Sequence, residues 1–183
     1  MVMRVLAMGV VCALIGCARG SSTVPSVEFA AEDEFLFDNS VDLVDKPAIV
    51  ESNWRGEFER RVTRADIIAV VKIESLSSDE DRRGSSYRLT AKVIDRLKGR
   101  SVRELLLRAH DDEPGFQSVR VNEDRLLRDP FVAFIKWQTD AESDQPVPRW
   151  HLSPDSPEVR DKVAFFSNPP SGDDRTQVEV LGP

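Results

Sequence analysis

One stretch constrains the fold most: residues 131–137, with the sequence Phe-Val-Ala-Phe-Ile-Lys-Trp, are apolar on both faces until Lys136. Successive side chains of a β-strand point to opposite faces, so such a strand needs cover on both sides. A central or closing strand of a barrel has this pattern. We therefore expect a body rich in β-structure, organised around this strand.

Alternation of apolar and polar residues predicts further strands. In residues 67–76 the odd-numbered positions up to Ile73 are all apolar, and in residues 87–93 apolar positions alternate with arginine, threonine and lysine. Ile94 and Leu97 break the second alternation, as a β-bulge or a barrel bend would. Residues 102–110 predict a third strand, whose inward face is Leu105, Leu107 and Ala109.

The remaining elements have weaker patterns. Residues 53–66 predict a short amphipathic helix with a core-facing stripe, because aromatic and aliphatic residues recur there every four positions. We expect a polar loop at 77–84, an acidic turn at 111–115, a weak strand at 116–121 and a short strand at 149–152. A helical turn at 159–166 and an edge strand at 176–181 complete the prediction. The stripe of the first helix is Trp54, Phe58 and Val62, and the packing residues of the helical turn are Val163, Phe165 and Phe166.

The N-terminal residues have the organisation of a secretory leader. One positive charge, Arg4, precedes eleven apolar residues (5–15), a length typical of a signal peptide and well below the ~20 residues of a spanning helix. Residues 14–17, Leu-Ile-Gly-Cys, resemble the bacterial lipobox. The resemblance implies cleavage between Gly16 and Cys17 and acylation of Cys17 with palmitate-type chains. The alternative is an ordinary signal peptide that is cleaved near Ala18.

Anchoring and composition place the chain in the cell envelope. Two or three acyl chains on Cys17 make membrane attachment effectively permanent, whereas one chain holds only marginally. Ala18 follows the cysteine in place of the aspartate that tends to retain enteric lipoproteins at the inner membrane, which favours the outer membrane by analogy. Cys12 leaves with the leader, so the mature body has no free thiol and no disulfide, and its stability depends on core packing.

Charge argues against nucleic acid as a partner. The formal net charge is −7, and it becomes −8 when Arg4 leaves with the leader. An acidic, exported chain is a poor ligand for phosphate backbones. A local basic stretch between the second and third predicted strands could serve an OB-type single-strand groove, but a solvated barrel rim explains it more simply. The stretch consists of Arg96, Lys98, Arg100, Arg103 and Arg108.

Residues 19–50 predict an acidic tether, which begins with the small polar run Gly-Ser-Ser-Thr at 20–23. Apolar residues occur within it, at 29, 35–37, 41, 43 and 44. They can dock on the body as an edge strand, or they can form a short linear motif for a partner. Docking or a plain tether is the simpler interpretation.

The order of the predicted elements is similar to that of a known module. Ala65-Asp66 stands before the first strand, and Val93-Ile94-Asp95-Arg96-Leu97-Lys98-Gly99 ends the second. These cues resemble bacterial domains of the netrin/TIMP type, a five-stranded OB-like barrel with a packed helix. The late-strand cue of that family is replaced here by Asp129-Pro130-Phe131. Family inhibitors place a free N-terminal cysteine on a catalytic zinc, which an acylated Cys17 would prevent.

We find no catalytic pattern. The sequence contains no Gly-x-Ser-x-Gly elbow and no glycine-rich phosphate loop, and none of its 32 acidic residues stands out as a catalytic pair. His110 precedes three acids, and His151 lies between Trp150 and Leu152. A metal at His110 is an alternative to a solvated turn, but metal sites need several ligands at close spacing. We predict no enzyme, no metal and no cofactor.

The sequence thus predicts a mainly β protein with a small five- to six-stranded OB-like antiparallel barrel and one short packed helix. Its expected organisation is a signal peptide (1–16), an acylated terminus with a tether (17–52), the barrel (53–152) and a C-terminal extension (153–183). The expected function is that of a membrane-anchored, non-catalytic binding or assembly module for another envelope protein, as in motility, secretion or adhesion machines. A carrier or sensor of a small lipid or glycan ligand is the alternative.

Overall fold

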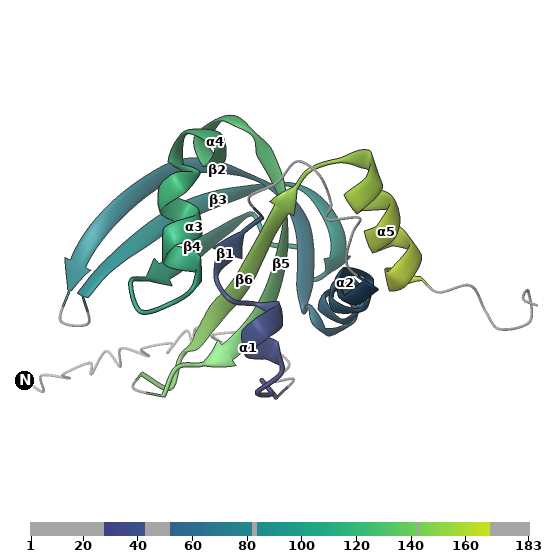
Figure 1. Ribbon diagram of the computed structural model, residues 1–183, viewed down its shortest axis with the longest axis horizontal. Coiled ribbons are helices and arrows are strands. Elements are labelled where there is room, and N and C mark those ends of the chain that lie inside the picture. The colour runs from purple at the N-terminus through teal and green to yellow at the C-terminus, as the bar shows by residue number, and fades with distance from the viewer. Residues whose placement is uncertain (1–27, 43–51, 82–83, 142, 169–183) are drawn as a thin grey trace, which may run out of the picture.

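The computed structural model describes residues 28–42, 52–81, 84–141 and 143–168. They form one curled six-stranded sheet in the order β1-β6-β5-β2-β3-β4 (Figure 1). All neighbouring strands are antiparallel except β1 and β6, which are parallel. The strands are β1 (Ser40–Val41), β2 (Ile67–Asp81), β3 (Gly84–Gly99), β4 (Glu104–His110), β5 (Pro130–Thr139) and β6 (Pro146–Pro154). The mainly β fold class is therefore confirmed.

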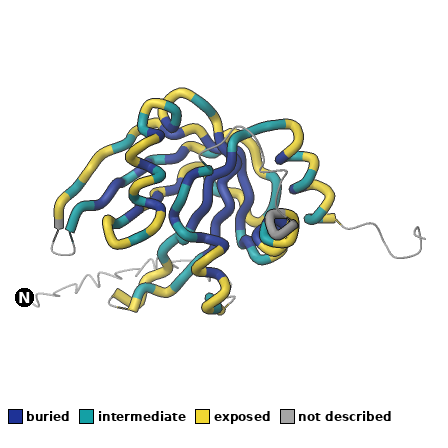
Figure 2. Tube along the Cα trace, viewed as in Figure 1, coloured by how far each residue is buried: buried dark blue, intermediate teal, exposed yellow. Residues whose placement is uncertain are grey.

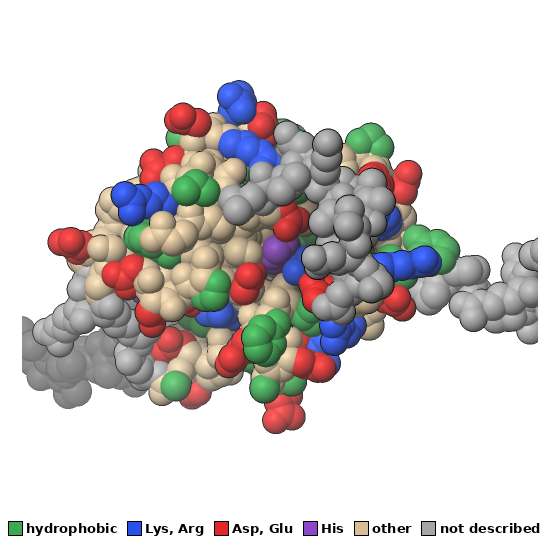
Figure 3. All heavy atoms as spheres, viewed as in Figure 1, with side chains coloured by type: hydrophobic (Ala, Val, Ile, Leu, Met, Phe, Trp, Pro, Cys, Tyr) green, Lys and Arg blue, Asp and Glu red, His purple; other side chains and the backbone are tan. Residues whose placement is uncertain are grey.

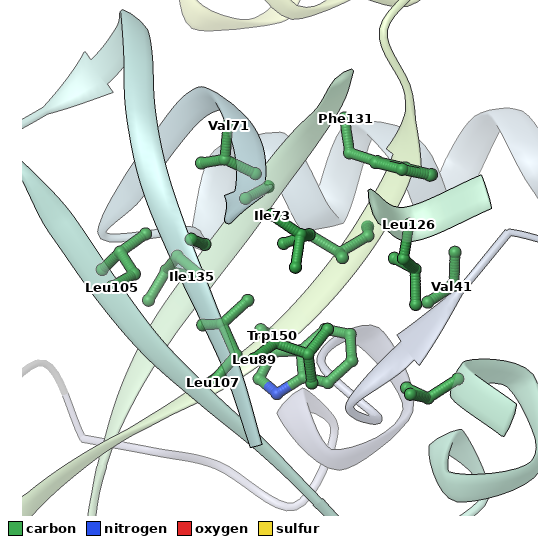
Figure 4. Close-up of a cluster of buried hydrophobic side chains, with 14 of the residues drawn as sticks. Val41, Val71, Ile73, Leu89, Leu105, Leu107, Leu126, Phe131, Ile135 and Trp150 are labelled. Atoms are coloured by element: carbon green, nitrogen blue, oxygen red, sulfur yellow. The ribbon is translucent and has the colours of Figure 1, made fainter. Parts of the chain in front are cut away.

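The inner side of the curled sheet holds the larger of two apolar clusters. The odd-numbered apolar residues of β2 and β5 point into it, together with Leu89 and Leu107 from the next two strands. Trp150 is fully buried and lies beside these two leucines (Figure 4). Burial is concentrated in the middle of the strands, and exposure on the outer sides of the helices (Figure 2). The predicted inward faces of residues 67–73 and 105–109 are thus confirmed.

The outer side of the same sheet holds the second cluster. Even-numbered residues of β2 and β5, including Ile68 and Phe134, pack against three helices there. The helices are α1 (Asp33–Leu36), α2 (Ser52–Arg64) and α5 (Pro157–Ser167). Phe58 and Val62 of α2 are buried, which confirms the core-facing stripe predicted for that helix at these two positions. The Phe58 and Phe134 rings meet edge to face at 5.6 Å.

Strand β5 is buried on both faces, as its composition predicts. Residues 131–135 are fully covered because β2 and β6 flank the strand and one cluster lies on each face. Lys136, which we expected to mark the polar end of the run, is itself 1% exposed. Its ammonium lies 3.1 Å from Asp66 Oδ1, so a carboxylate compensates the buried charge.

The β2–β3 pairing contains the irregularities that the sequence indicates. Val70 pairs with Asp95 and Val71 with Val93, so Ile94 is an extra residue in β3. Leu97 is skipped in the same way between Lys98 and Arg96. Such bulges increase bend and twist locally. The predicted break in alternation at Ile94 and Leu97 is confirmed.

Three predictions of local structure are wrong. The polar residues 77–84 are not a loop up to Asp81: β2 continues through them and pairs with β3 as far as Gly84 (Figure 1). Strand β6 begins at Pro146, inside the loop that we expected before residue 149. Phe165 does not pack down, because its side chain is 53% exposed.

The weak strand predicted at 116–121 is also wrong. The chain there forms α3 (Gly115–Val121), followed by α4 (Glu123–Arg128). Val119 and Leu126 are fully buried, seven residues apart on one side of the two helices, and they belong to the inner cluster. This spacing is helical, but the segment is short and its apolar residues are few. Helix α3 contacts both β1 and β4.

Candidate ligand groove and the polar clusters beside it

Strand β4 is one edge of the sheet and directs alternate backbone groups away from β3. In an antiparallel pair, every second residue bonds to its neighbour strand with both its N–H and its C=O. The Trp150 indole N–H donates to the Arg108 carbonyl at 2.9 Å, and the His110 N–H donates to Glu113 Oε2 at 2.9 Å. The backbone N–H and C=O groups of the even-numbered residues of β4 therefore point away from β3. Among these residues, Arg108 and His110 already have hydrogen-bond partners.

Strand β6 lies across from this edge of β4, and its own edge there has few free N–H donors. Both backbone groups of Trp150 bond to Asn39 on the side of β6 away from β5: the N–H donates to the side-chain Oδ1 of Asn39 at 3.1 Å, and the carbonyl accepts from Asn39 N at 2.8 Å. By the same alternation, Pro148 and Pro146 face that side too. Proline has no N–H, so this part of β6 offers no donor to another strand.

The space between the two edges is a groove of about 720 Å³, called the β4 groove here. Strand β4 forms one wall, and the hairpin of β5 and β6 forms the other. Its lining combines apolar surface with charged side chains of both signs. The lining residues are Asn39, Glu104, Leu105, Leu106, Arg108, His110, Glu113, Trp137, Gln138, Thr139, Asp140, Ala141, Pro146, Val147, Pro148 and Arg149.

Glu113 closes one end of the β4 groove. Its carboxylate accepts hydrogen bonds from the Asn39 side chain (2.9 Å to each oxygen), from His110 N and from Arg149 Nη1. The Glu113 and Arg149 side chains are only 16% and 19% exposed. The charge-assisted contact ties β1, β4 and β6 together at this end. These contacts close the groove at its His110 end.

Two polar atoms of groove-lining residues have no partner among the described residues. They are Trp137 Nε1 and His110 Nδ1, both buried. The Arg100 guanidinium lies over the Trp137 ring, 5.3 Å from its centroid. Buried polar atoms are nearly always hydrogen-bonded, so unpaired ones call for an explanation.

A second polar arrangement, the His151 cluster, joins residues 38–42 to β6. His151 Nδ1 lies 3.2 Å from Asp38 Oδ1, and Nε2 lies 3.2 Å from Asp42 Oδ1. The Ser153 hydroxyl donates to Asp42 Oδ2 at 2.6 Å. Only a doubly protonated imidazole can donate to two carboxylates at once. The His151 side chain is 6% exposed.

Charges around this cluster favour the ionised aspartates. Burial raises the pKa of Asp42, but hydrogen bonds from His151 and Ser153 and the positive charges of His151 and Arg61 outweigh it and lower the pKa to about 2. For Asp38, burial likewise raises the pKa, and the bonds and charges of His151, with smaller effects of Ser40 and Arg61, lower it below its ordinary value. Both aspartates therefore hold the segment as anions.

The His151 cluster contains the residue types of a catalytic triad but not its connectivity. Ser40 Oγ lies 3.2 Å from His151 Nδ1, yet its hydroxyl donates to Asp38 Oδ1 at 2.5 Å. A nucleophilic serine needs its proton directed to the histidine. With both ring nitrogens against carboxylates, the arrangement favours fixing β1 to β6 over activating a hydroxyl. The sequence signal that indicates this cluster is Asp38, Ser40 and Asp42 at strand spacing.

The residues singled out from sequence have different outcomes. Cys17 and Gly16 lie outside the described residues. His110 lies at the end of β4 in the wall of the groove. In the basic stretch, Lys98 Nζ donates to the carbonyls of Val62 and Thr63 near the end of α2, at 2.6 and 2.8 Å. Acidic and basic side chains are interspersed over the face shown in Figure 3.

Among the described residues, no group of three or more histidine, cysteine, aspartate or glutamate side chains is arranged to hold a metal ion. No helix in the same part of the chain is long and apolar enough to cross a membrane. Comparisons of this chain with protein-family models, with curated proteins and with solved structures gave no match.

Proposed function

We propose that this chain is a lipid-anchored lipoprotein of the bacterial cell envelope, whose body is a non-catalytic binding and assembly module. The observation that carries the proposal is the β4 groove. It follows β4 from Glu104 to His110, a length of about 20 Å at ~3.3 Å per residue. One wall is an open strand edge, and the other is a hairpin edge blunted by two prolines.

The partner is another envelope protein, such as a subunit of a surface or trans-envelope machine for motility, secretion or adhesion. The mixed lining of the β4 groove suits a polypeptide, which brings both apolar side chains and polar backbone groups. The excess of acidic over basic residues, 32 against 25, argues against nucleic acid.

The anchor is proposed from the sequence alone. The Leu-Ile-Gly-Cys pattern at 14–17 supports acylation of Cys17, and the outer membrane is favoured over the inner one. Acylation would hold the binding module at the bilayer surface independently of charge.

The body is proposed to be an OB-type barrel, similar to the netrin/TIMP module, that is open along one side. The connectivity supports this: β2 pairs with both β3 and β5, β4 pairs with β3, and β6 pairs with β5. Helices α3 and α4 stand between β4 and β5 in the chain. The groove would then occupy the position where β4 and β6 close such a barrel.

A carrier or sensor of a small lipid or glycan is the second candidate. The groove volume of about 720 Å³ favours it, because small-molecule sites commonly measure ~300–1,000 Å³. Mass spectrometry of the protein extracted under native conditions discriminates between the two. A stoichiometric small molecule, released by Val147→Trp, would favour the carrier.

The test of the binding function is partner recovery after crosslinking in intact cells. We expect the acylated parent protein to recover one defined protein partner. Val147→Trp adds bulk inside the β4 groove and should lower recovery by about tenfold or more, as loss of a central contact does. Val121→Trp is the matched control, because Val121 is 68% exposed on α3 and does not line the groove. Equal recovery from both variants, or none from the parent, contradicts the proposal.

A further inference from the structure

The open part of the β4 edge is short and well defined. Of the outward-facing residues, Arg108 and His110 have partners for their carbonyl groups, from Trp150 and Glu113. The outward backbone groups of Glu104 and Leu106 have no hydrogen-bond partner among the described residues. Both residues line the β4 groove. An edge with free N–H and C=O groups is a template for another strand.

Among the described residues, no strand occupies this position beside β4. Strand β6 is the next edge across the groove, but its outward positions there are Pro146 and Pro148. Without N–H groups these positions cannot complete a ladder with β4. Contact between the two strands is made instead by the Trp150 side chain. The space opposite Glu104 and Leu106 is therefore left for a chain that supplies its own donors.

We propose that an extended segment of the partner protein adds to the sheet as a strand beside β4, antiparallel to it, and bonds the backbone of Glu104 and Leu106. This inference rests on the proposed function, because it states how the same groove holds its partner. Main-chain bonds would supply affinity and alternate side chains would supply specificity.

The side chains on the outer face of β4 determine which segment fits. Glu104, Leu106 and Arg108 share that face and are all exposed, with Leu106 at 53%. Opposite charges and apolar pairs are favourable across neighbouring strands. The segment therefore carries Lys or Arg opposite Glu104, an aliphatic residue opposite Leu106, and Asp or Glu opposite Arg108.

A second copy of this chain is the competing occupant. Strand β4 read in the antiparallel direction places Arg108 opposite Glu104, so its pattern is also complementary to itself. A second copy, however, brings β3 and the rest of its sheet against the β5–β6 hairpin that forms the other wall. A single strand brings only its own backbone and side chains, and the geometry favours it.

Two substitutions at one position separate backbone pairing from side-chain contact. Leu106→Pro removes the outward N–H and no hydrogen bond to β3, whereas Leu106→Ala removes the side chain and keeps the N–H. In the crosslinking experiment we expect partner recovery to fall about tenfold or more with proline, and no more than about threefold with alanine. Equal effects of the two substitutions would overturn strand addition.

Circular dichroism shows whether Leu106→Pro folds. If it does not, a synthetic peptide tests strand addition on the unsubstituted protein. The probe is the blocked peptide Thr-Glu-Val-Ile-Thr-Lys-Thr, added to the full-length acylated protein in detergent micelles; in antiparallel register its lysine lies opposite Glu104 and its glutamate opposite Arg108. Its isoleucine amide faces Leu106, so N-methylation there should weaken binding about tenfold or more, and N-methylation of the valine amide should not. No binding, or equal weakening by both methyl groups, would overturn strand addition.

The outcomes also separate this inference from the function on which it rests. If the parent recovers no partner, the proposed function fails. If Val147→Trp abolishes recovery and Leu106→Pro leaves it intact, the groove binds its partner without strand addition, and only the inference fails. A dimer in light scattering that Leu106→Pro converts to a monomer would assign the edge to a second copy and overturn the inference.

Discussion

Lys136 shows how one buried charge is accommodated in the central strand. Its ammonium lies 3.1 Å from Asp66 Oδ1, and the other Asp66 oxygen accepts from the Trp137 backbone N–H at 2.9 Å. Asp66 stands between α2 and β2, so the pair connects the helix end to β5. The sequence shows a lysine after an apolar run, but only the fold shows that a carboxylate 70 residues earlier is beside it.

We predict unequal losses of stability from substituting the two members of this ion pair. Asp66→Asn leaves a buried cation without its carboxylate and should lower the free energy of unfolding by about 3 kcal/mol. Lys136→Met removes the charge with a side chain of similar length and should cost about 1 kcal/mol, since Asp66 keeps its bond from Trp137. Urea denaturation at pH 7 measures both. A larger cost for Lys136→Met would contradict the account.

The His151 cluster predicts a pH dependence. The pKa of Asp42 is about 2 in the folded protein, below its ordinary value of 3.8, so its stabilisation is present above pH ~4 and is lost as pH falls toward 2. Asp42→Asn should therefore lower stability at pH 7 and make little difference near pH 2. Denaturation of parent and variant across this range checks it. A difference that is independent of pH would contradict the assignment.

At the scale of elements, the sequence predicts the strands that have strong alternation. It does not predict segments whose secondary structure depends on contacts with other parts of the fold. The odd-numbered residues of 67–73 and of 87–91 form the apolar face that the alternation predicts, and that face is buried. Residues 77–81 are polar and still form a strand, because β3 pairs with them. Residues 116–121 are too short a segment for periodicity to separate a helix from a strand. Pairing with β3 makes residues 77–81 a strand. Burial of Val119 in the inner cluster favours the helix at residues 116–121.

Alanine substitution at two glycines, Gly99 and Gly56, should change stability in opposite directions. Gly99 ends β3 at φ +82°, and a Cβ there would lie 2.0 Å from the Asp66 carbonyl oxygen. Gly99→Ala should therefore cost about 2 kcal/mol or more. Gly56 lies in α2 with nothing within 4 Å of an added Cβ, so Gly56→Ala should add about 0.5–1 kcal/mol. Thermal denaturation compares the two, and a shift of the same sign for both would contradict the assigned backbone.

At the scale of the whole molecule, the β4 groove arises from parts that are distant in sequence. Its walls come from residues 104–110 and 137–149, and Asn39 contributes to its closed end. Neither Pro146 nor Pro148 suggests a binding site in the sequence, where they read as loop residues. Only the fold shows that β6 lies across from β4, where the two prolines remove N–H donors from its edge. The sequence could therefore predict a β-rich body with one core, but not the groove.

The anchor predicts how the whole molecule distributes in the cell. Cys17→Ala should remove the acyl mass and move the protein from the membrane to the soluble fraction, since an acidic body has no charge attraction for anionic lipid. Mass spectrometry and membrane sedimentation measure both effects. A substituted protein that sediments with membranes like the parent would contradict lipid anchoring.

The most direct test of a binding function at the β4 groove is site-specific photo-crosslinking in intact cells. A photoreactive residue in place of Thr139 lies in the groove, and one in place of Thr63 lies on the exposed side of α2. The account predicts one protein adduct of defined mass from position 139 and none from position 63. No adduct from position 139, or the same adduct from both positions, would contradict it.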